Sequence, residues 1–233
     1  MRRLGFRLAL GAFVLGSVAT AATAATPLER EVLAALNMAR TDPAGYIRAL
    51  EQYRTYFRAN LVALPGQPED YETEEGVAAV DDSIAFLKRQ TPLPPISESD
   101  MLADSAAEHV ADQAATGETG HEGSDGSSPA QRVRRRGGGG YVAEVIAYGP
   151  LDALDTIRQL IVDDGVADRG HRSVLYSPEL RFAGVSCGQH PDYRTMCVID
   201  LGITPDGRDG RVGRIRQATR TARAPRQFAW NDR

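Results

Sequence analysis

Three polar residues stand in settings where side chains can do chemistry. His121 lies in the polar, glycine-rich run Gly120–Gly126, and His171 lies in the turn-like run Asp168–Ser173. Glu144 is an isolated acid in the otherwise apolar segment 142–146. A buried carboxylate is costly unless it is paired or hydrogen-bonded. Glu144 is therefore expected to have a partner, and a histidine is a natural one.

Two imidazoles with one or two carboxylates form a donor set that suits a divalent metal such as zinc. The same groups could serve as acid and base. The sequence has no H-E-x-x-H helix, because His121-Glu122 is followed by Gly123, Ser124 and Asp125. It has no G-x-S-x-G elbow either, because its one match to those letters, centred on Ser186, lies in a strand-like run, where Ser186 is expected to be a strand residue. No catalytic nucleophile can be identified, so enzymatic activity is left open and a non-enzymatic role is favoured. A purely structural role in turns is the alternative for both histidines.

The other two histidines are assigned simpler roles. His109 follows Leu102 and Ala106 at helical spacing, at the edge of an apolar stripe. We predict a hydrogen-bonded histidine at the edge of the core rather than a ligand. His190 stands beside Pro191 in a hairpin loop and is expected to be solvated.

Cys187 and Cys197 are the two cysteines of the chain. An even number in an exported protein indicates a disulfide. The residues around them read as two strands joined by a loop, which predicts a hairpin stapled near its open end. Two free buried thiols are the alternative.

The elements that must position these residues follow a mixed pattern. Apolar residues recur at helical spacing in several segments, and short strand-like runs follow near the end. The expected helices are 27–40, 43–57, 77–90, 101–115 and 151–162, with short ones at 129–135 and 172–176. Residues 62–76 and 137–140 are expected to be loops, the second without a phosphate-loop signature. Residues 141–148 are expected to be a strand or irregular, and 182–187 and 196–202 to form the hairpin. This order predicts an α+β fold.

The N-terminus resembles a secretory signal peptide. Arg2, Arg3 and Arg7 precede an apolar stretch over residues 8–18, and Ala22-Thr23-Ala24 offers a cleavage site. An uncleaved membrane anchor is the alternative, although the apolar stretch is short for one. We expect a signal peptide at 1–25, one domain at 26–205 and an arginine-rich tail at 206–233, in a secreted or periplasmic protein with no transmembrane segment after cleavage.

Charge is distributed unevenly along the chain. The body, 26–205, carries 16 basic and 28 acidic residues, a net charge of −12. Such a body would repel phosphates, so we expect no nucleic acid as a partner. The tail carries eight Arg and three Asp, and could dock on the body or contact an anionic envelope surface; a solvated, poorly ordered end is the simpler expectation. Arginine outnumbers lysine 26 to 1, a bias typical of a GC-rich bacterial genome.

Five short motifs in order resemble bacterial CAP domains (cysteine-rich secretory, antigen 5, pathogenesis-related 1; also called SCP domains). The resemblance covers about residues 30–204, apart from an extra stretch at about 45–92. The motifs are Leu36-Asn37-Met38-Ala39-Arg40, the helix Leu102–His109, Gly120-His121, Ala143-Glu144-Val145-Ile146 and Gly170-His171-Arg172-Ser173-Val174-Leu175.

The resemblance implies a three-layer α-β-α sandwich with a small antiparallel sheet and a surface cleft. In the family this cleft is lined by two histidines and two acids, which here correspond to His121, Glu144 and His171. The second acid precedes the Gly-His motif, where Asp163 and Asp164 stand, and Asp164 is taken as the fourth member. Ala143 and Val145 replace the usual glycine and asparagine around the glutamate, so the polar groups beside it differ from the family's pattern.

The function expected from these features is that of an exported binding module. Its cleft would hold a divalent metal, with zinc as a possible cofactor, or a lipid or peptide, in the cell envelope or outside the cell. The alternative is a metal-assisted hydrolase of peptides or cell-wall material. A structural envelope protein that uses its tail is a third hypothesis. Family membership does not decide among them, since one fold hosts unrelated functions.

Overall fold

The structure, a computed structural model, describes residues 24–67, 70–150 and 152–210. Almost all of the predicted signal peptide and the tail beyond residue 210 lie outside the described residues. The helices are α1 (Pro27–Thr41), α2 (Pro43–Arg54), α3 (Val77–Leu87), α4 (Asp100–Thr116), α5 (Pro129–Arg135), α6 (Ala153–Val162) and α7 (Gly170–Leu175). The strands are β1 (Phe57–Arg58), β2 (Leu61–Val62), β3 (Tyr71–Glu72), β4 (Ser97–Glu98), β5 (Val142–Tyr148), β6 (Phe182–His190) and β7 (Arg194–Gly202).

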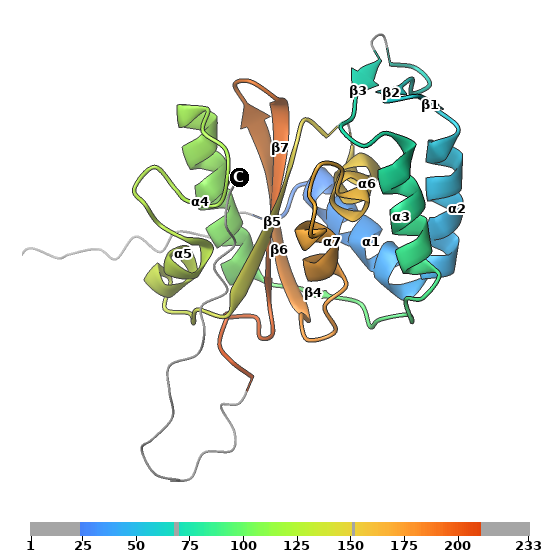
Figure 1. Cartoon of the computed structure of the whole chain (residues 1–233). Coiled ribbons are helices and arrows are strands. Elements are labelled where there is room, and N and C mark those ends of the chain that lie inside the picture. The colour runs from blue at the N-terminus through green and yellow to red at the C-terminus, as the bar shows by residue number, and fades with distance from the viewer. Residues whose placement is uncertain (1–23, 68–69, 151, 211–233) are drawn as a thin grey trace, which may run out of the picture.

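The central sheet has four strands in the order β4-β6-β7-β5. β4 runs parallel to β6, and the other pairs are antiparallel. Helices α4 and α5 cover one face of the sheet, and α1, α6 and α7 cover the other (Figure 1). This arrangement confirms the predicted α+β class and the α-β-α sandwich. Among the described residues, no helix is long and apolar enough to cross a membrane.

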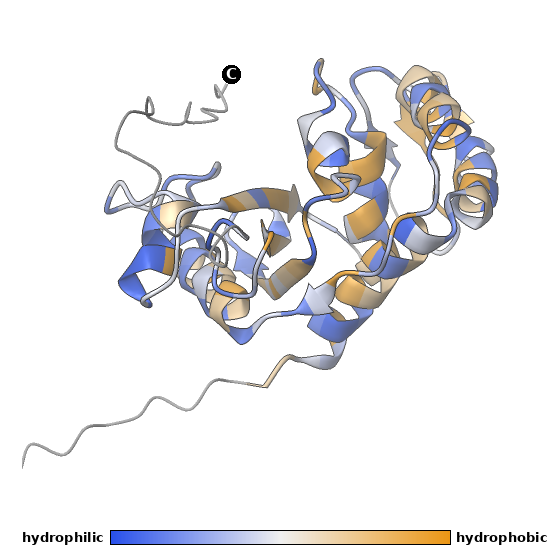
Figure 2. Ribbon diagram, turned by 90° about the horizontal axis from the view of Figure 1, so that it is seen from below, coloured by the Kyte–Doolittle hydropathy of each residue, from blue (hydrophilic) through white to orange (hydrophobic). Residues whose placement is uncertain are grey.

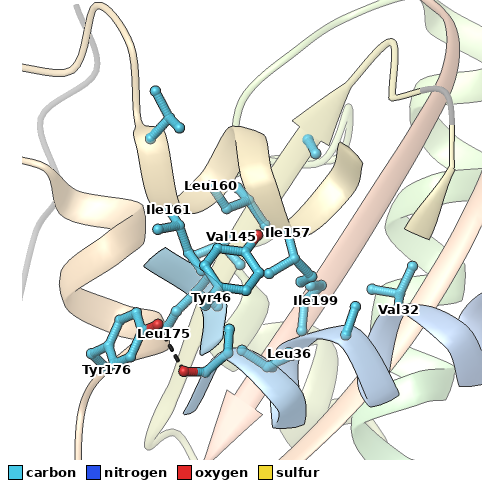
Figure 3. Close-up of a cluster of buried hydrophobic side chains, with 14 of the residues drawn as sticks. Val32, Leu36, Tyr46, Val145, Ile157, Leu160, Ile161, Leu175, Tyr176 and Ile199 are labelled. Carbon is cyan, nitrogen blue, oxygen red and sulfur yellow. Dashed lines mark hydrogen bonds between the residues drawn. The ribbon is translucent and has the colours of Figure 1, made fainter. Parts of the chain in front are cut away.

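Two apolar clusters hold the layers together. The larger lies between the sheet and the helices on the α1 side, and includes Leu36, Val145 and Ile199 (Figure 3). The smaller lies under α4 and includes Ile146 and Val198. Because successive side chains of a strand point to opposite faces of the sheet, consecutive residues of β5 pack into different clusters. Hydrophobic and hydrophilic residues alternate along the helices (Figure 2).

The stretch 45–92 packs as part of the same domain. Helices α2 and α3 lie outside α1 and α6 (Figure 1), and they add Tyr46, Leu50 and Val80 to the larger core. The prediction of a loop at 62–76 was wrong in part, because Val62 and Tyr71–Glu72 belong to β2 and β3 of a small antiparallel sheet. Its third strand, β1, follows α2, which ends at Arg54 and not at residue 57 as predicted. Each of these strands has two residues, which is too short to show an alternating pattern.

The Leu-Asn-x-x-Arg motif of α1 is structural. Arg40 is fully buried and donates to the backbone oxygens of Leu175, the last residue of α7, and of Ser177 and Leu180 just after it. The Asn37 amide bonds both backbone groups of Ile96, at 2.9 and 2.7 Å, and so fixes the approach to β4. On the same side of the sheet, the Tyr176 hydroxyl donates to the Ala39 oxygen at 3.0 Å (Figure 3).

Cys187 and Cys197 form a disulfide between directly opposed residues of β6 and β7. The hairpin is longer than predicted, with its turn at residues 191–193. The disulfide therefore lies nearer the turn than the open end, so the prediction of a staple at the open end was wrong. His190 is also not solvated: its ring is buried, Nε2 donates to the Glu118 oxygen at 3.1 Å, and Nδ1 accepts from the Asp192 amide.

Candidate functional site

Glu144 and His121 form the first polar pair. Glu144 lies on β5, with its side chain only 1% exposed. Its Oε1 is 2.9 Å from Nδ1 of His121, whose side chain is 29% exposed. The partner that the sequence analysis expected for this acid is therefore present in the structure.

Arg132 on α5 is the second partner of Glu144. Its side chain is 1% exposed, and Nη2 donates to Oε2 of Glu144 at 2.5 Å. Nη1 donates to the backbone oxygens of His121, at 3.1 Å, and Ser127, at 2.9 Å. One guanidinium thus holds both the acid and the loop that carries its histidine. Sequence analysis missed Arg132. This residue belongs to an arginine-rich run, which is typical of a helix whose side chains face solvent.

His109 and Gln113 fix the same loop from α4. Nε2 of His109 lies 2.8 Å from the Gly120 oxygen, and the Gln113 amide donates to that oxygen at 2.7 Å. The Gly120 amide in turn donates to the Tyr148 hydroxyl at 2.9 Å. Burial, helped by the nearby charge of Arg132, lowers the pKa of His109 to about 4. The predicted hydrogen-bonded histidine at the core edge is confirmed, and it is neutral at physiological pH.

Asp200 completes this buried cluster from β7. It lies directly across from Glu144 in the strand register and is fully buried. Burial raises the pKa of Glu144 to about 7, against the opposing effect of Arg132. Burial and the charge of Glu144 raise the pKa of Asp200 well above its usual value. Sequence analysis missed Asp200, although Val198-Ile199-Asp200-Leu201 shows the same isolated acid that singled out Glu144.

His171 and Asp163 form the second polar pair. Nδ1 of His171 lies 2.6 Å from Oδ1 of Asp163, whose side chain is 2% exposed. Oδ2 of Asp163 accepts from the backbone amides of His171 and Arg172, at 3.0 and 3.3 Å. The prediction placed His171 in a turn before a short helix, but α7 begins at Gly170, and Asp163 accepts from two backbone amides of its first turn.

Asp164, the predicted fourth member, makes different contacts. Its carboxylate accepts from the backbone amides of Glu74 and Glu75, at 2.7 and 2.9 Å. Asp163 adopts a left-handed backbone (φ 58°) where α6 ends, and there it pairs with His171. The acid beside His171 is therefore Asp163, and Asp164 instead ties the α6–α7 turn to the segment before α3.

A groove of about 770 Å³ lies beside the second pair. Its walls come from the end of α2, the small sheet, β5, α6 with the turn after it, α7 and the tip of the β6–β7 hairpin. The lining residues include Tyr53, Phe57, Tyr71, Ile146, Ala147, Tyr148, Arg158, Leu160, Asp163, His171, Tyr193 and Arg194. The stretch 45–92 thus supplies one wall of the groove.

The groove follows the outer edge of β5. Within the described residues, β5 pairs only with β7, so its other edge carries no strand. Ile146 and Tyr148 point to the α4 face of the sheet, and Ala147 points to the opposite face. Because all three line one groove, the groove must lie at the strand's edge rather than over either face.

Residues 33–201 match the model of the cysteine-rich secretory protein family, CAP. The chain belongs to the CAP family. No curated protein matches it in sequence. All five motifs of the CAP resemblance fall within the matched region, as do both histidine–acid pairs.

Two solved bacterial structures are similar to this CAP domain. An outer surface protein from Borrelia burgdorferi is 16% identical, with a TM-score of 0.39, over 47% of this chain and 77% of that one. An extracellular protein with an SCP domain from Bacillus anthracis is 18% identical, with a TM-score of 0.38, over 54% of this chain and 37% of that one.

The polar residues of this CAP domain form two pairs rather than one metal-binding group. Among the described residues, no three His, Cys, Asp or Glu side chains are grouped closely enough to hold a metal ion. Glu144 is engaged by Arg132 and His121, and Asp163 by His171 and two amides. This set does not fit a zinc centre of three or four protein ligands. The zinc cofactor expected at His121, Glu144, His171 and Asp164 stays an untested prediction.

Proposed function

We propose that this CAP-domain protein is an exported binding module that holds an extended peptide segment in the groove beside β5. The observation that carries the proposal is that consecutive residues of an edge strand, Ile146, Ala147 and Tyr148, line a single groove. An extended peptide can add to an exposed sheet edge, where backbone hydrogen bonds give affinity and side-chain pockets give specificity.

The backbone of β5 offers the necessary hydrogen-bonding groups. The Gly149 amide donates to the Thr195 oxygen at 2.8 Å, so residue 149 points its backbone groups toward β7. In an antiparallel pair this orientation alternates. Ala147 therefore faces β7, whereas Ile146 and Tyr148 direct their backbone amides and oxygens outward, into the groove.

The lining suits a peptide better than a plain lipid chain. Phe57 and Val166, which are partly exposed, supply apolar surface together with the tyrosine rings, while the tyrosine hydroxyls and charged residues supply hydrogen-bonding groups around it. Binding sites commonly combine an apolar surface with a few placed polar groups. Export is supported by the predicted signal peptide and by the disulfide, since disulfides persist in oxidising compartments.

Peptide selection tests the proposal. Decapeptides selected on the purified exported protein from a random phage-displayed library would be labelled with fluorescein and titrated by anisotropy. Gln159→Trp, which fills the groove from α6, should weaken binding at least tenfold. Leu154→Trp, on the same helix but 55% exposed and outside the groove, should bind like the wild type. Failure to select any peptide, or full binding by Gln159→Trp, contradicts the proposal.

N-methylation of the selected peptide tests strand addition directly. Methyl groups on alternate amides should abolish binding in one register and leave it intact in the other, because only alternate residues of an added strand face β5. Equal effects in both registers would exclude strand addition. Binding of a fluorescent fatty acid in place of peptides would favour the lipid hypothesis, and cleavage of the peptide, seen by mass spectrometry, would favour the hydrolase.

A further inference from the structure

The four glycines at 137–140 receive a segment from the C-terminal side of the chain. After β7 the chain turns at Thr204 and passes beside the end of α5 (Figure 1). The Gly139 amide donates to the Asp206 oxygen, and the Tyr141 amide donates to the Gly207 oxygen, both at 2.8 Å. Residues 204–208, which we call the strap, therefore pack on the domain, and they include the first residues of the predicted tail.

The backbones of the strap and of the glycine run approach too closely for a side chain to lie between them. A Cβ atom at Gly138 would lie 2.5 Å from the Asp206 oxygen. One at Gly139 would collide with the Gly207 oxygen and lie 2.7 Å from Cα of Arg208. Close approach of two backbones is a use to which glycine is suited. The predicted loop at 137–140 is thus also the packing surface for the strap.

Side chains fasten the strap to two helices. The Ser99 hydroxyl, at the start of α4, donates to the Pro205 oxygen at 2.5 Å. The Arg208 guanidinium donates to the Gly137 oxygen, just after α5, at 2.8 Å. The Thr204 hydroxyl closes the turn of the strap, because it accepts from the Arg208 amide at 2.7 Å. The strap therefore joins the end of β7 to the start of α4 and to the end of α5.

The strap also covers the buried apolar residue of α5. Val133 is fully buried but belongs to neither apolar cluster of the core. A Cβ atom at Gly138 or Gly207 would lie 2.6 or 3.1 Å from Cγ1 of Val133, so both glycines lie directly against it. Ion pairs also join the C-terminal arginines of α5 to Glu108, but they are partly exposed, and such pairs stabilise little. The packing of Val133, and with it the position of α5, therefore depends on the strap.

Arg132 connects α5 to the first polar pair. Its guanidinium donates to Glu144 and to the backbone oxygens of His121 and Ser127. The Gly123 amide donates to the same Ser127 oxygen at 2.9 Å, so Arg132 and the loop that carries His121 share an acceptor. A shift of α5 would therefore take Arg132 away from all three of its acceptors at once.

We propose that the strap is a conformational device that locks α5, and that its release separates Arg132 from Glu144 and loosens the loop that carries His121. The chain continues from the strap directly into the arginine-rich residues beyond 210. An event at the tail that dislodges the strap is therefore transmitted through α5 to the first polar pair. This inference is independent of the proposed peptide-binding function.

Native-state hydrogen exchange of the purified protein, measured by NMR, tests this inference. The Gly139 and Tyr141 amides report on the strap, and the Gly123 amide reports on the loop. Local openings cost less free energy than global unfolding. The three amides should therefore exchange with one common free energy of opening, lower than that of the amides that join β6 to β7. Exchange of the three amides only through global unfolding would overturn the proposal.

A matched pair of glycine variants assigns the opening to the strap. Gly139→Ala sets a methyl group against the backbone of the strap, and should lower the protection factors of the Tyr141 and Gly123 amides at least tenfold. Gly140→Ala meets only the guanidinium of Arg134, an exposed and flexible side chain, and should leave both protection factors unchanged. Loss of protection at Tyr141 without a loss at Gly123 would refute the link from the strap to the polar pair.

A gentler change keeps the proposal testable if Gly139→Ala does not fold. Thr204→Val preserves the shape of the side chain but removes the hydroxyl that closes the turn of the strap. It should lower the same two protection factors at least threefold. Thr41→Val removes an exposed hydroxyl that donates within α1, and should leave them unchanged. No loss of protection in Thr204→Val, or an equal loss in both threonine variants, would overturn the role of the strap.

Discussion

The carboxyl groups of Glu144 and Asp200 lie opposite each other across β5 and β7, buried beneath α4. Two like charges this close in a buried site are strongly unfavourable. Glu144 faces the guanidinium of Arg132, whereas Asp200 has burial and the charge of Glu144 acting against its ionised form. Because the guanidinium contacts Glu144 and not Asp200, we infer that the negative charge of the pair is stabilised better on Glu144 and that Asp200 holds its proton to higher pH than an ordinary aspartate.

Replacing Asp200 with asparagine should flatten the dependence of stability on pH. The folded state keeps the Asp200 proton at pH values where the unfolded chain, with an ordinary aspartate pKa of about 3.9, has released it. Wild-type stability therefore falls as pH rises above that value, by up to about 1.4 kcal/mol per pH unit from this group. Asp200→Asn mimics the protonated form and lacks this loss. In urea denaturation from pH 5 to pH 8, the free energy of unfolding of the variant should increase relative to that of the wild type as pH rises. A difference that stays constant with pH would refute a proton held by Asp200 in the folded state.

Removing Arg132 should destabilise the domain strongly. Arg132→Met keeps much of the side-chain volume but leaves the buried charge of Glu144 without its guanidinium, which costs about 3–5 kcal/mol for a buried pair. Adding Glu144→Gln should recover part of the loss, because the unpaired charge is then removed. Arg134→Met, exposed on the same helix, should change the free energy of unfolding by less than about 0.5 kcal/mol. Additive effects of the Arg132 and Glu144 changes in urea denaturation would show that the two are not coupled.

The fold was predictable because its elements are long and its motifs ordered. Glu144 stood out as a lone acid in an apolar strand, and Asp200 could have been found by the same criterion. The choice between Asp163 and Asp164 was not accessible, since it depends on a left-handed residue at the end of α6 that turns one carboxylate toward His171. The groove was equally hidden, because Tyr53, Phe57 and Tyr71 reach it from a segment whose two-residue strands have no detectable period.

Asp163 and Asp164 should differ in their importance for stability. Asp163→Ala removes an acceptor for His171 and for two amides of α7, and leaves alanine in a left-handed conformation that aspartate tolerates better. Adding the lost hydrogen bonds, we expect a loss of roughly 3 kcal/mol or more. Asp164→Ala releases two amides that water can reach and should cost about 1 kcal/mol. Thermal and urea unfolding of both variants would check this ranking, and an equal loss in the two would contradict the role assigned to Asp163.

Peptide binding in the groove should not require a metal ion. His121 and His171 belong to separate pairs, and the carboxylates of both pairs are already engaged. A zinc ion held by the imidazoles alone would have fewer protein ligands than the three or four of ordinary zinc sites, and a chelator should remove it readily. We expect dialysis against EDTA to leave the affinity for the selected peptide unchanged, with mock-dialysed protein as the control. If EDTA abolished binding, and zinc restored it to the wild type but not to His171→Ala, the metal would be part of the peptide site and the two pairs would have to act together.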